Sequence, residues 1–415
     1  MPVVAAVDTG GTFTDLVART SAGVVEHVKV ASTPDDPSRA IGEALDELKR
    51  RLARRDLVAE VEEVRHGTTV ATNALLERRG ARVVLITTAG FEDLLRLRRQ
   101  DRPDLYALHP VVPPPLVEVK NTLGIEERLG PKGEICKPLE DLESWMERHH
   151  STLQRAESIA VCLLHAYVNG DHEEAVGRAL RARFGSTPIS LSSQLAPVFR
   201  EYERCSTVAV NAYVAPVMGR YLQRLDAALT PALLRVESSS GGLMSVGDVV
   251  RKPVYTVLSG PAGGVRGAWL AAMRAGRSRL LTLDMGGTSA DVSLIEGALS
   301  PDDVGQLAEH PLRIPLLPIE TVGAGGGSIA WVDAGGALRV GPRSAGAVPG
   351  PAAYGRAGGE AAATVTDAHV VLGRLDRLLG GEMTLDVQAA HDAIARLATR
   401  LGSGVEQTAS AIIEI

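Results

Sequence analysis

Short apolar runs alternate with helix-forming segments along most of the chain. Buried strands are predicted where aliphatic residues follow one another between polar or turn-forming stretches, at residues 3–7, 83–88, 159–164, 188–191 and 233–237. Helices are predicted between them, at residues 40–53, 171–184 and 199–229, and two more between residue 385 and the last residue. This alternation of strand and helix is typical of α/β domains.

One polar motif occurs twice. An apolar strand ends in Asp8, a Gly-Gly-Thr turn follows, and Asp15 stands seven residues after the first aspartate. The pattern returns at Asp284 and Asp291. Paired glycines let amide groups approach a ligand closely, and an aspartate at a strand end can hold a divalent cation through water. Two such hairpins facing each other are therefore predicted to clamp a polyphosphate and its cation.

The predicted clamp has separate metal and phosphate residues. Asp8 and Asp284 are the expected ligands of Mg²⁺ or Mn²⁺. The expected phosphate-binding residues lie in the two hairpins and in two other glycine-rich segments: Thr9, Gly10, Gly11, Thr12, Thr14, Gly286, Gly287, Thr288, Gly263, Gly264, Gly325 and Gly326. Gly263 and Gly264 are expected in a turn that joins a strand at residues 257–258 to a helix, where free N–H groups favour anions. Glycines there could equally serve close packing of a helix on a sheet.

Three residues are candidates for acid–base catalysis. Asp15 and Asp291 could each act as a base or position water, or could accept hydrogen bonds from the amides of their own hairpins. His66 lies before a Gly-Thr-Thr loop, and an imidazole that titrates near neutral pH could serve as acid or base, or could simply cap the strand end. Residues 171–173 are interpreted as an exposed helix N-terminus, and Asp367 as structural.

Composition excludes several classes of protein. Hydrophobic residues make up 45% and charged residues 23% of the 415, as in ordinary soluble proteins. A net charge of −6 gives no electrostatic case for nucleic acid, and no apolar run is long enough to span a membrane. Three well-separated cysteines argue against a disulfide framework and a zinc site. We therefore expect a cytoplasmic protein.

Two domains are expected, each with one hairpin. The first covers residues 1–190, and the second covers residues 191–415 and is expected to be incomplete at its C-terminus. Residues 96–139 contain a proline run at 113–115 and are expected to leave the core as a lid or a partner surface.

The duplicated Asp-x-Gly-Gly-Thr hairpin resembles that of the ATPase superfamily of actin, sugar kinases and heat-shock chaperones. More narrowly, the chain resembles the A-type subunit of the hydantoinase/oxoprolinase family, which includes the acetone carboxylase beta subunit. The segments that carry this resemblance are residues 8–15, 66–77, 201–204, 259–264, 284–291, 323–328 and 341–346. His369 departs from the family pattern, which has Asn there, and Ser238–Ser240 replaces Gln-Ser-Asn.

The resemblance implies an α/β, actin-like (ribonuclease H-like) fold of duplicated domains with mixed sheets flanked by helices. It implies ATP with Mg²⁺ or Mn²⁺ as cofactors and a small cyclic amide as substrate. A B-type hydantoinase subunit is the implied partner, in a homo- or hetero-oligomer. The implied reaction is ATP-dependent hydrolysis, in which the substrate carbonyl is phosphorylated before the ring opens. An acetone carboxylase-like subunit and a nucleotide-dependent switch are the alternatives. An inactive fragment is a further alternative, because family members extend beyond residue 415 and carry a further glycine-rich loop over the adenosine.

Overall fold

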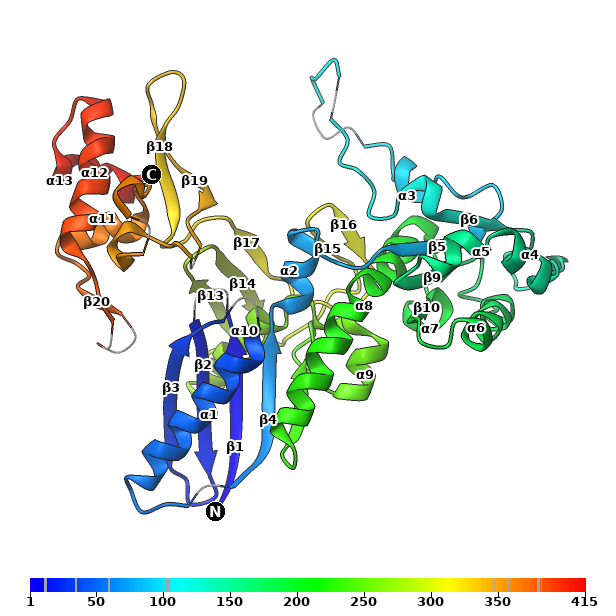
Figure 1. Cartoon of the computed structure of the whole chain (residues 1–415), viewed down its shortest axis with the longest axis horizontal. Coiled ribbons are helices and arrows are strands. Elements are labelled where there is room, and N and C mark those ends of the chain that lie inside the picture. Colours follow the sequence, from blue (N-terminus) through cyan, green and yellow to red (C-terminus); the bar gives the residue numbers. More distant parts are fainter. Residues whose placement is uncertain are drawn as a thin grey trace. The chain divides into compact units, whose positions relative to one another are not determined.

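The structure, a computed structural model, describes residues 1–415 except 11, 12, 34, 35, 59, 102–104, 110, 347, 357, 379, 380 and 382. The chain forms two compact units, each assembled from segments that are distant in the sequence (Figure 1). Unit 1 comprises Met1–Gly67, Gly260–Leu299 and Pro318–Ile415. Unit 2 comprises Thr68–Ser259 and Ser300–Leu317.

The first hairpin belongs to a sheet of unit 1. Within unit 1 the strands of this six-stranded sheet lie in the order β4-β1-β2-β3, with bounds β1 (Pro2–Thr9), β2 (Phe13–Thr20), β3 (Val25–Ala31) and β4 (Glu60–Thr68). β1 and β2 are antiparallel, and Asp8 lies directly opposite Asp15. β3 continues the antiparallel order on the other side of β2. The strand predicted at residues 3–7 is thus confirmed.

Helix α1 (Pro37–Ala53) covers one face of this sheet and contacts all three strands of the meander (Figure 1). It begins with Pro37 in the first helical position, and Asp36 accepts the N–H of Ser38 as N-cap. Its apolar stripe is buried and consists of Ala40, Ile41, Ala44, Leu45, Leu48 and Leu52. Strand alternation presents the matching apolar face, because Val3, Ala5 and Val7 are buried while the residues between them are not.

The second hairpin repeats this geometry within the same unit. It follows helix α10 (Ser259–Arg274), and its strands lie in the order β13 (Arg279–Met285), β14 (Ala290–Glu296) and β17 (Glu320–Val322). β13 and β14 are antiparallel, with Asp284 opposite Asp291. The register of the two hairpins is therefore the same.

The rest of unit 1 packs around a small aliphatic core that includes Ala330, Ile394, Leu397 and Ile412. Its elements are β18 (Ser328–Val332), β19 (Leu338–Ser344), η3 (Ala352–Tyr354), η4 (Gly358–Glu360), α11 (Val365–Val371), β20 (Arg377–Leu378), β21 (Met383–Thr384), α12 (Val387–Leu401) and α13 (Val405–Glu414). The buried Asp367 accepts the N–H groups of Ala352, Ala353 and Thr364, which supports the structural interpretation of this residue.

Unit 2 is built on a parallel sheet in the order β10-β9-β5-β6. These strands are β5 (Val83–Thr88), β6 (Thr122–Ile125), β9 (Ser158–Cys162) and β10 (Ile189–Leu191). Every residue of β5 and β9 is buried, as expected for parallel strands covered on both faces.

Helices and short strands complete unit 2. The helices are α2 (Val70–Leu76), α3 (Leu94–Leu97), η1 (Val119–Asn121), α4 (Leu142–Arg148), α5 (His150–Gln154), α6 (Asp171–Arg183), α7 (Ser192–Leu195), α8 (Glu201–Leu229), α9 (Val246–Arg251) and η2 (Pro253–Thr256). The short strands are β7 (Arg128–Leu129), β8 (Ile135–Lys137), β11 (Leu233–Glu237), β12 (Leu243–Ser245), β15 (Gly305–Leu307) and β16 (His310–Leu312). Among the residues that the structure describes, no helix is both long and apolar enough to cross a membrane.

Two local predictions are wrong. Residues 96–139 do not leave the core throughout, because β6 pairs with β5 and Ile125 is fully buried. The strand expected at residues 257–258 is absent, and α10 begins at Ser259, so Gly263 and Gly264 lie inside a helix rather than in a turn before it. In both places tertiary packing overrides the local preference of glycine and proline.

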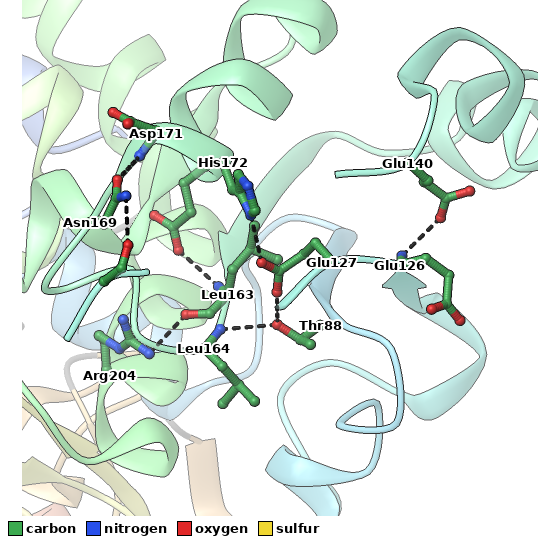
Figure 2. A network of polar contacts seen from close by, with 12 residues as sticks. Thr88, Glu126, Glu127, Glu140, Leu163, Leu164, Asn169, Asp171, His172 and Arg204 are labelled. Atoms are coloured by element: carbon green, nitrogen blue, oxygen red, sulfur yellow. Dashed lines mark hydrogen bonds and ion pairs between the residues drawn. The ribbon is translucent and has the colours of Figure 1, made fainter. Parts of the chain in front are cut away.

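A buried polar network joins several segments of unit 2 (Figure 2). His172 contacts a carboxylate oxygen of Glu127 at 2.7 Å, and Thr88 donates to the other oxygen of Glu127 while accepting the N–H of Leu164. Arg204 donates to the carbonyl of Leu163 at 2.9 Å. These bonds tie the ends of β5 and β9 to the first turns of α6 and α8.

Glu173 is the second buried carboxylate of this network. It accepts hydrogen bonds from the N–H groups of Leu163 and Ser193 and from the hydroxyl of Ser192, at 2.6–2.8 Å. Burial raises the pKa of Glu173, and the three donors together with the charge of Arg204 oppose that rise. The expectation that residues 171–173 form an exposed helix end is therefore wrong for His172 and Glu173, which are buried.

We predict that Glu173→Ala lowers the free energy of unfolding by about 3–5 kcal/mol, because it leaves three donors buried without their acceptor and removes the carboxylate whose charge opposes that of the buried Arg204. Glu174→Ala is the matched control, since Glu174 is exposed on the same helix and should change stability by less than about 0.5 kcal/mol. Urea denaturation measures both. Equal effects of the two substitutions would contradict a structural role for the network.

Candidate nucleotide-binding site

The two hairpin turns close in the same way. The N–H of Gly10 donates to the carbonyl of Phe13 at 3.0 Å, and the N–H of Gly286 donates to the carbonyl of Ser289 at 2.9 Å. Thr14 is buried with its hydroxyl 3.0 Å from that of Ser32, so it braces the first turn from inside. Gly11 and Thr12 lie outside the described residues. In the second turn Gly286 and Thr288 are exposed and Gly287 is half-buried.

Asp8 sits in a cradle of backbone. A Cβ atom added to Gly67 would lie 2.9 Å from the Oδ1 atom of Asp8, and one added to Gly260 would lie 2.8 Å from the same atom. Both distances are shorter than real Cβ contacts. Gly67 ends the first chain segment of unit 1 and Gly260 lies in the first turn of α10, so two distant segments meet at this carboxylate. Neither glycine was singled out from the sequence as a site residue, although both lie in segments that carry the family resemblance.

The electrostatics at Asp8 are unfavourable for a free carboxylate. One side of Asp8 reaches solvent, but the rest of its carboxylate is enclosed by protein, and this desolvation raises its pKa to about 6. The charges of Asp15 and Asp284 raise the pKa further, while Lys29 and the N–H of Thr9 act in the opposite direction. The charge of Asp284 thus acts on Asp8, and the sequence-predicted pair of metal ligands is brought within electrostatic range.

This donor set fits a hard divalent cation. Carboxylate oxygens are the ligands that Mg²⁺ prefers, and a cation between Asp8 and Asp284 would relieve the repulsion that raises the pKa of Asp8. In the part of the chain that the structure describes, no group of three or more His, Cys, Asp or Glu side chains is arranged as a metal site. A cation held here would therefore take its other ligands from water and from phosphate oxygens.

The second aspartate of each hairpin has a partner on the third strand. Asp15 lies opposite Lys29 and forms an ion pair with it at 2.6 Å. Asp291 lies opposite Thr321, whose hydroxyl donates to it at 2.6 Å. Burial raises the pKa of Asp291, the bond from Thr321 opposes this, and the charge of Asp284 adds to the rise. Each of these two carboxylates is thus held by the residue opposite it on the third strand, Lys29 on β3 or Thr321 on β17.

His66 is fully buried beneath the first hairpin. Its Nδ1 atom lies 3.2 Å from the carbonyl oxygen of Val7, and burial lowers its pKa to about 4 although the carbonyl acts against this. The imidazole is therefore neutral at physiological pH. In this conformation it braces β4 against β1, the strand that ends in Asp8.

The segment around Gly325 supports the second turn through backbone contacts. The N–H groups of Gly326 and Gly327 donate to the carbonyls of Gly286 and Gly287, at 3.1 and 2.6 Å. A Cβ atom on Gly325 would lie 2.7 Å from the backbone of that turn. The amides of Gly325 and Gly326 are thus bonded to protein, the former to the hydroxyl of Ser328. These glycines shape the turn instead of offering free N–H groups.

Gly263 and Gly264 lie near the start of α10. The Cβ position of Gly264 is 4.0 Å from a carboxylate oxygen of Asp284, which places this part of the helix beside the second hairpin. Gly260 is close to Asp8 in the same helical turn. The beginning of α10 therefore borders both aspartates of the predicted clamp.

Two family models match the chain. The family model described as hydantoinase/oxoprolinase matches residues 204–415, and the model of its N-terminal region matches residues 4–184. The chain belongs to the hydantoinase/oxoprolinase family. Within the family it is 38% identical to the caprolactamase subunit alpha of Pseudomonas jessenii, over 99% of this chain and 60% of that subunit. It is 36% identical to the 5-oxoprolinase of Saccharomyces cerevisiae, over 89% of this chain and 31% of that protein.

Solved structures of family members confirm the expected fold. The nucleotide-free structure of acetone carboxylase, from work on ATP-dependent acetone carboxylation, superposes with a TM-score of 0.84 at 29% identity. It covers 99% of this chain and 61% of that one. The fold is therefore the mixed α/β architecture of the hydantoinase-like, actin-like ATPases. The chain therefore spans about 60% of the length of the caprolactamase subunit alpha and of the acetone carboxylase chain, although each of them matches 99% of this chain.

We predict that Asp8→Asn stabilises the protein more at pH 7.5 than at pH 4.5, when no divalent cation is present. A folded-state pKa of about 6 means that the folded protein holds a proton that the unfolded chain has already lost, so stability falls as pH rises from about 4 to 6. The asparagine variant does not titrate at this position, so its stability does not fall in this way. Melting temperatures of the wild type and the variant at the two pH values test the prediction, with Asp46→Asn, at an exposed residue, as the control. A difference from wild type that does not change with pH would contradict the prediction.

We predict different effects of alanine substitution at two glycines of α10. Gly267→Ala, where the new Cβ meets open space, should stabilise the protein by roughly 0.5–1 kcal/mol through helix propensity. Gly260→Ala should lose this gain, because its Cβ forces the Asp8 carboxylate out of its position. Urea denaturation and a crystal structure of Gly260→Ala measure the two effects. Equal stabilisation by both, with Asp8 unmoved, would show that the cradle imposes no constraint.

Proposed function

We propose that the chain is the nucleotide-binding part of an ATP-dependent enzyme that opens a cyclic amide. The observation that carries the proposal is the pair of hairpins with identical register in one compact unit, each ending its first strand in an aspartate. Asp8 and Asp284 would hold Mg²⁺ or Mn²⁺ of the bound nucleotide. Exposed turn residues, Gly286 and Thr288 among them, would contact the phosphates.

ATP suits the chemistry of amide hydrolysis. The amide carbonyl is deactivated by its nitrogen, and that nitrogen leaves poorly. Transfer of the γ-phosphoryl group to the carbonyl oxygen would release ADP and leave an electrophilic carbon that carries a good leaving group. Water can then add to that carbon, and the tetrahedral adduct collapses with cleavage of the ring C–N bond, which releases the amine and leaves an acyl phosphate. A second water hydrolyses this acyl phosphate to the carboxylate and phosphate. The protein's contribution to phosphoryl transfer is positioning and charge neutralisation, for which a clamp of two hairpins is suited.

Asp15, Asp291 and His66 are assigned supporting roles in this proposal. The two aspartates are close enough to Asp8 and Asp284 to alter their environment, and Asp291 with its raised pKa is the better candidate for positioning or deprotonating water. His66 is neutral and buried, so it would act by holding β1 and Asp8 in place.

The relatives support this reaction class and one alternative. The names caprolactamase and 5-oxoprolinase both denote enzymes that act on a cyclic amide, and the solved caprolactamase is described as ATP-dependent. Similarity to acetone carboxylase favours an ATP-dependent carboxylase subunit as the second candidate. Because the caprolactamase relative is a subunit alpha, we propose a second, B-type subunit as partner in a heteromeric complex.

We predict that Mg²⁺-ATP binds this chain in a calorimetric titration and that Asp8→Ala and Asp284→Ala each weaken binding at least tenfold, because each removes a cation ligand. Asp46→Ala, on the solvent side of α1, is the control and should bind like wild type. ADP release with caprolactam or 5-oxoproline, compared with acetone plus bicarbonate, then separates the two reactions. Binding that survives both substitutions, or no binding at millimolar nucleotide, would overturn the proposed site.

A further inference from the structure

The two hairpins are rich in negative charge and poor in positive charge. They carry four carboxylates, at Asp8, Asp15, Asp284 and Asp291. Residues 1–18 and residues 280–296, which form most of the two hairpins, contain no lysine or arginine. A nucleoside triphosphate is itself strongly anionic, and a divalent cation neutralises part of the combined charge. A further positive group beside these turns would therefore favour binding of the nucleotide.

Lys29 places an ammonium group beside the first turn. It lies on β3 opposite Asp15, and its Nζ atom is 2.8 and 2.6 Å from the two carboxylate oxygens of that residue. The same Nζ atom lies 5.2 Å from the centre of the Phe13 ring. Phe13 is the first residue of β2, and its carbonyl accepts the N–H of Gly10 that closes the turn. The ammonium group is thus close to the turn, and its charge lowers the pKa of Asp8.

The ion pair between Lys29 and Asp15 is exposed to solvent. The side chain of Lys29 is 42% accessible and that of Asp15 is 51% accessible. Exposed ion pairs contribute little to stability, because water solvates both partners. The four-carbon stem of lysine is flexible, and its ammonium group can turn to a new partner. Little free energy therefore opposes transfer of Lys29 from Asp15 to a more highly charged anion.

The second hairpin has a neutral residue at the equivalent position. Thr321 lies opposite Asp291 and donates its hydroxyl to the carboxylate at 2.6 Å. A hydroxyl can hold a carboxylate in place, but it brings no charge that could neutralise a phosphate. Although the two hairpins share one register, a basic residue opposite the second aspartate is found in the first copy alone. The first hairpin is therefore better suited to the most highly charged end of a nucleotide.

We propose that Lys29 exchanges partners, from Asp15 in the free protein to the terminal phosphate of a bound nucleoside triphosphate. The inference rests on the proposed function, since it concerns the same site, and it adds a residue that selects triphosphate over diphosphate. Lysine binds phosphate as a point charge and needs no fixed geometry, so the exchange requires a change in its side chain alone. Lys29 is a specificity-determining residue in this role, and Asp15 is its resting partner.

The test is a calorimetric titration with Mg²⁺ and either ADP or β,γ-methylene-ATP, whose terminal phosphate cannot be transferred. Lys29→Met keeps an unbranched side chain but removes the charge. It should weaken binding of the triphosphate analogue at least about tenfold and change the affinity for ADP less than about twofold. Unchanged ADP binding also shows that the variant is folded. Lys49→Met, at an exposed lysine that is ion-paired with Asp46 on α1, is the control and should bind both ligands like wild type.

Asp15→Asn separates the exchange from a simple effect of charge. In the wild-type background it should tighten binding of the triphosphate analogue, because a negative charge is lost and because Lys29 no longer has to leave a carboxylate. In the Lys29→Met background the first effect alone remains, so the gain should be at least about threefold smaller. Equal gains in the two backgrounds would overturn the exchange. Equal losses of ADP and triphosphate affinity in Lys29→Met would overturn it as well.

These outcomes distinguish failure of the inference from failure of the proposed function. A wild-type chain that binds neither nucleotide would overturn both. A wild-type chain that binds both nucleotides, with a Lys29→Met variant that keeps its affinity for the triphosphate analogue, would overturn the exchange and leave the nucleotide site intact. Because the measurement is binding without turnover, it does not depend on which amide or ketone the enzyme accepts.

Discussion

The alternation of side chains along β1 links the hydrophobic core of unit 1 to its candidate site. Because Val3, Ala5 and Val7 must lie under α1, Asp8 has to point to the other face of the sheet. A slip of one residue would bury the carboxylate under the helix and expose the aliphatic residues. Both changes lower stability, because a charge loses its hydration and an apolar face loses its burial. Hydrophobic burial therefore fixes the direction of the carboxylate on which the site depends.

Close contacts with glycine backbone also position the site residues. The Asp8 carboxylate is enclosed by Gly67 and Gly260, and the turn at Gly286 is held by the N–H of Gly326. In each case the two partners are far apart in the sequence, and any Cβ atom at the closest glycines would be too near. Glycine is required at these positions because the neighbouring segments leave no room for a side chain.

The sequence was sufficient for features that are encoded locally. Period-two and helical patterns predicted both hairpins, α1 and the buried strands β5 and β9, because in each the apolar pattern of one short segment reports the face that is covered. The pairing of Asp8 with Asp15, and of Asp284 with Asp291, follows from equal spacing around a two-glycine turn. The family and the fold class were predicted correctly for the same reason, since the motifs that identify them are continuous in sequence.

Features that depend on distant partners could not be predicted in this way. β6 follows a proline-rich stretch whose composition suggests a surface loop, and it becomes a strand only because β5 offers it an edge. His172 and Glu173 have the composition of an exposed helix start, yet Glu127 and the amides beside Ser192 draw them into the interior. The enclosure of Asp8 by Gly67 and Gly260 could not be predicted either, because these glycines come from two segments that meet only in the folded chain.

The environment that would suit Asp8 for cation binding lowers the stability of the protein when no cation is bound. Enclosure by backbone and the nearby charges of Asp15 and Asp284 raise the pKa of Asp8 to about 6, so the folded protein holds a poorly solvated carboxylate that the unfolded chain would hydrate. Binding of a divalent cation would reverse the sign of this interaction, because the same crowded oxygens then become ligands. A cation that bound only the folded state would offset this cost in stability, and its binding would then be coupled to folding of unit 1.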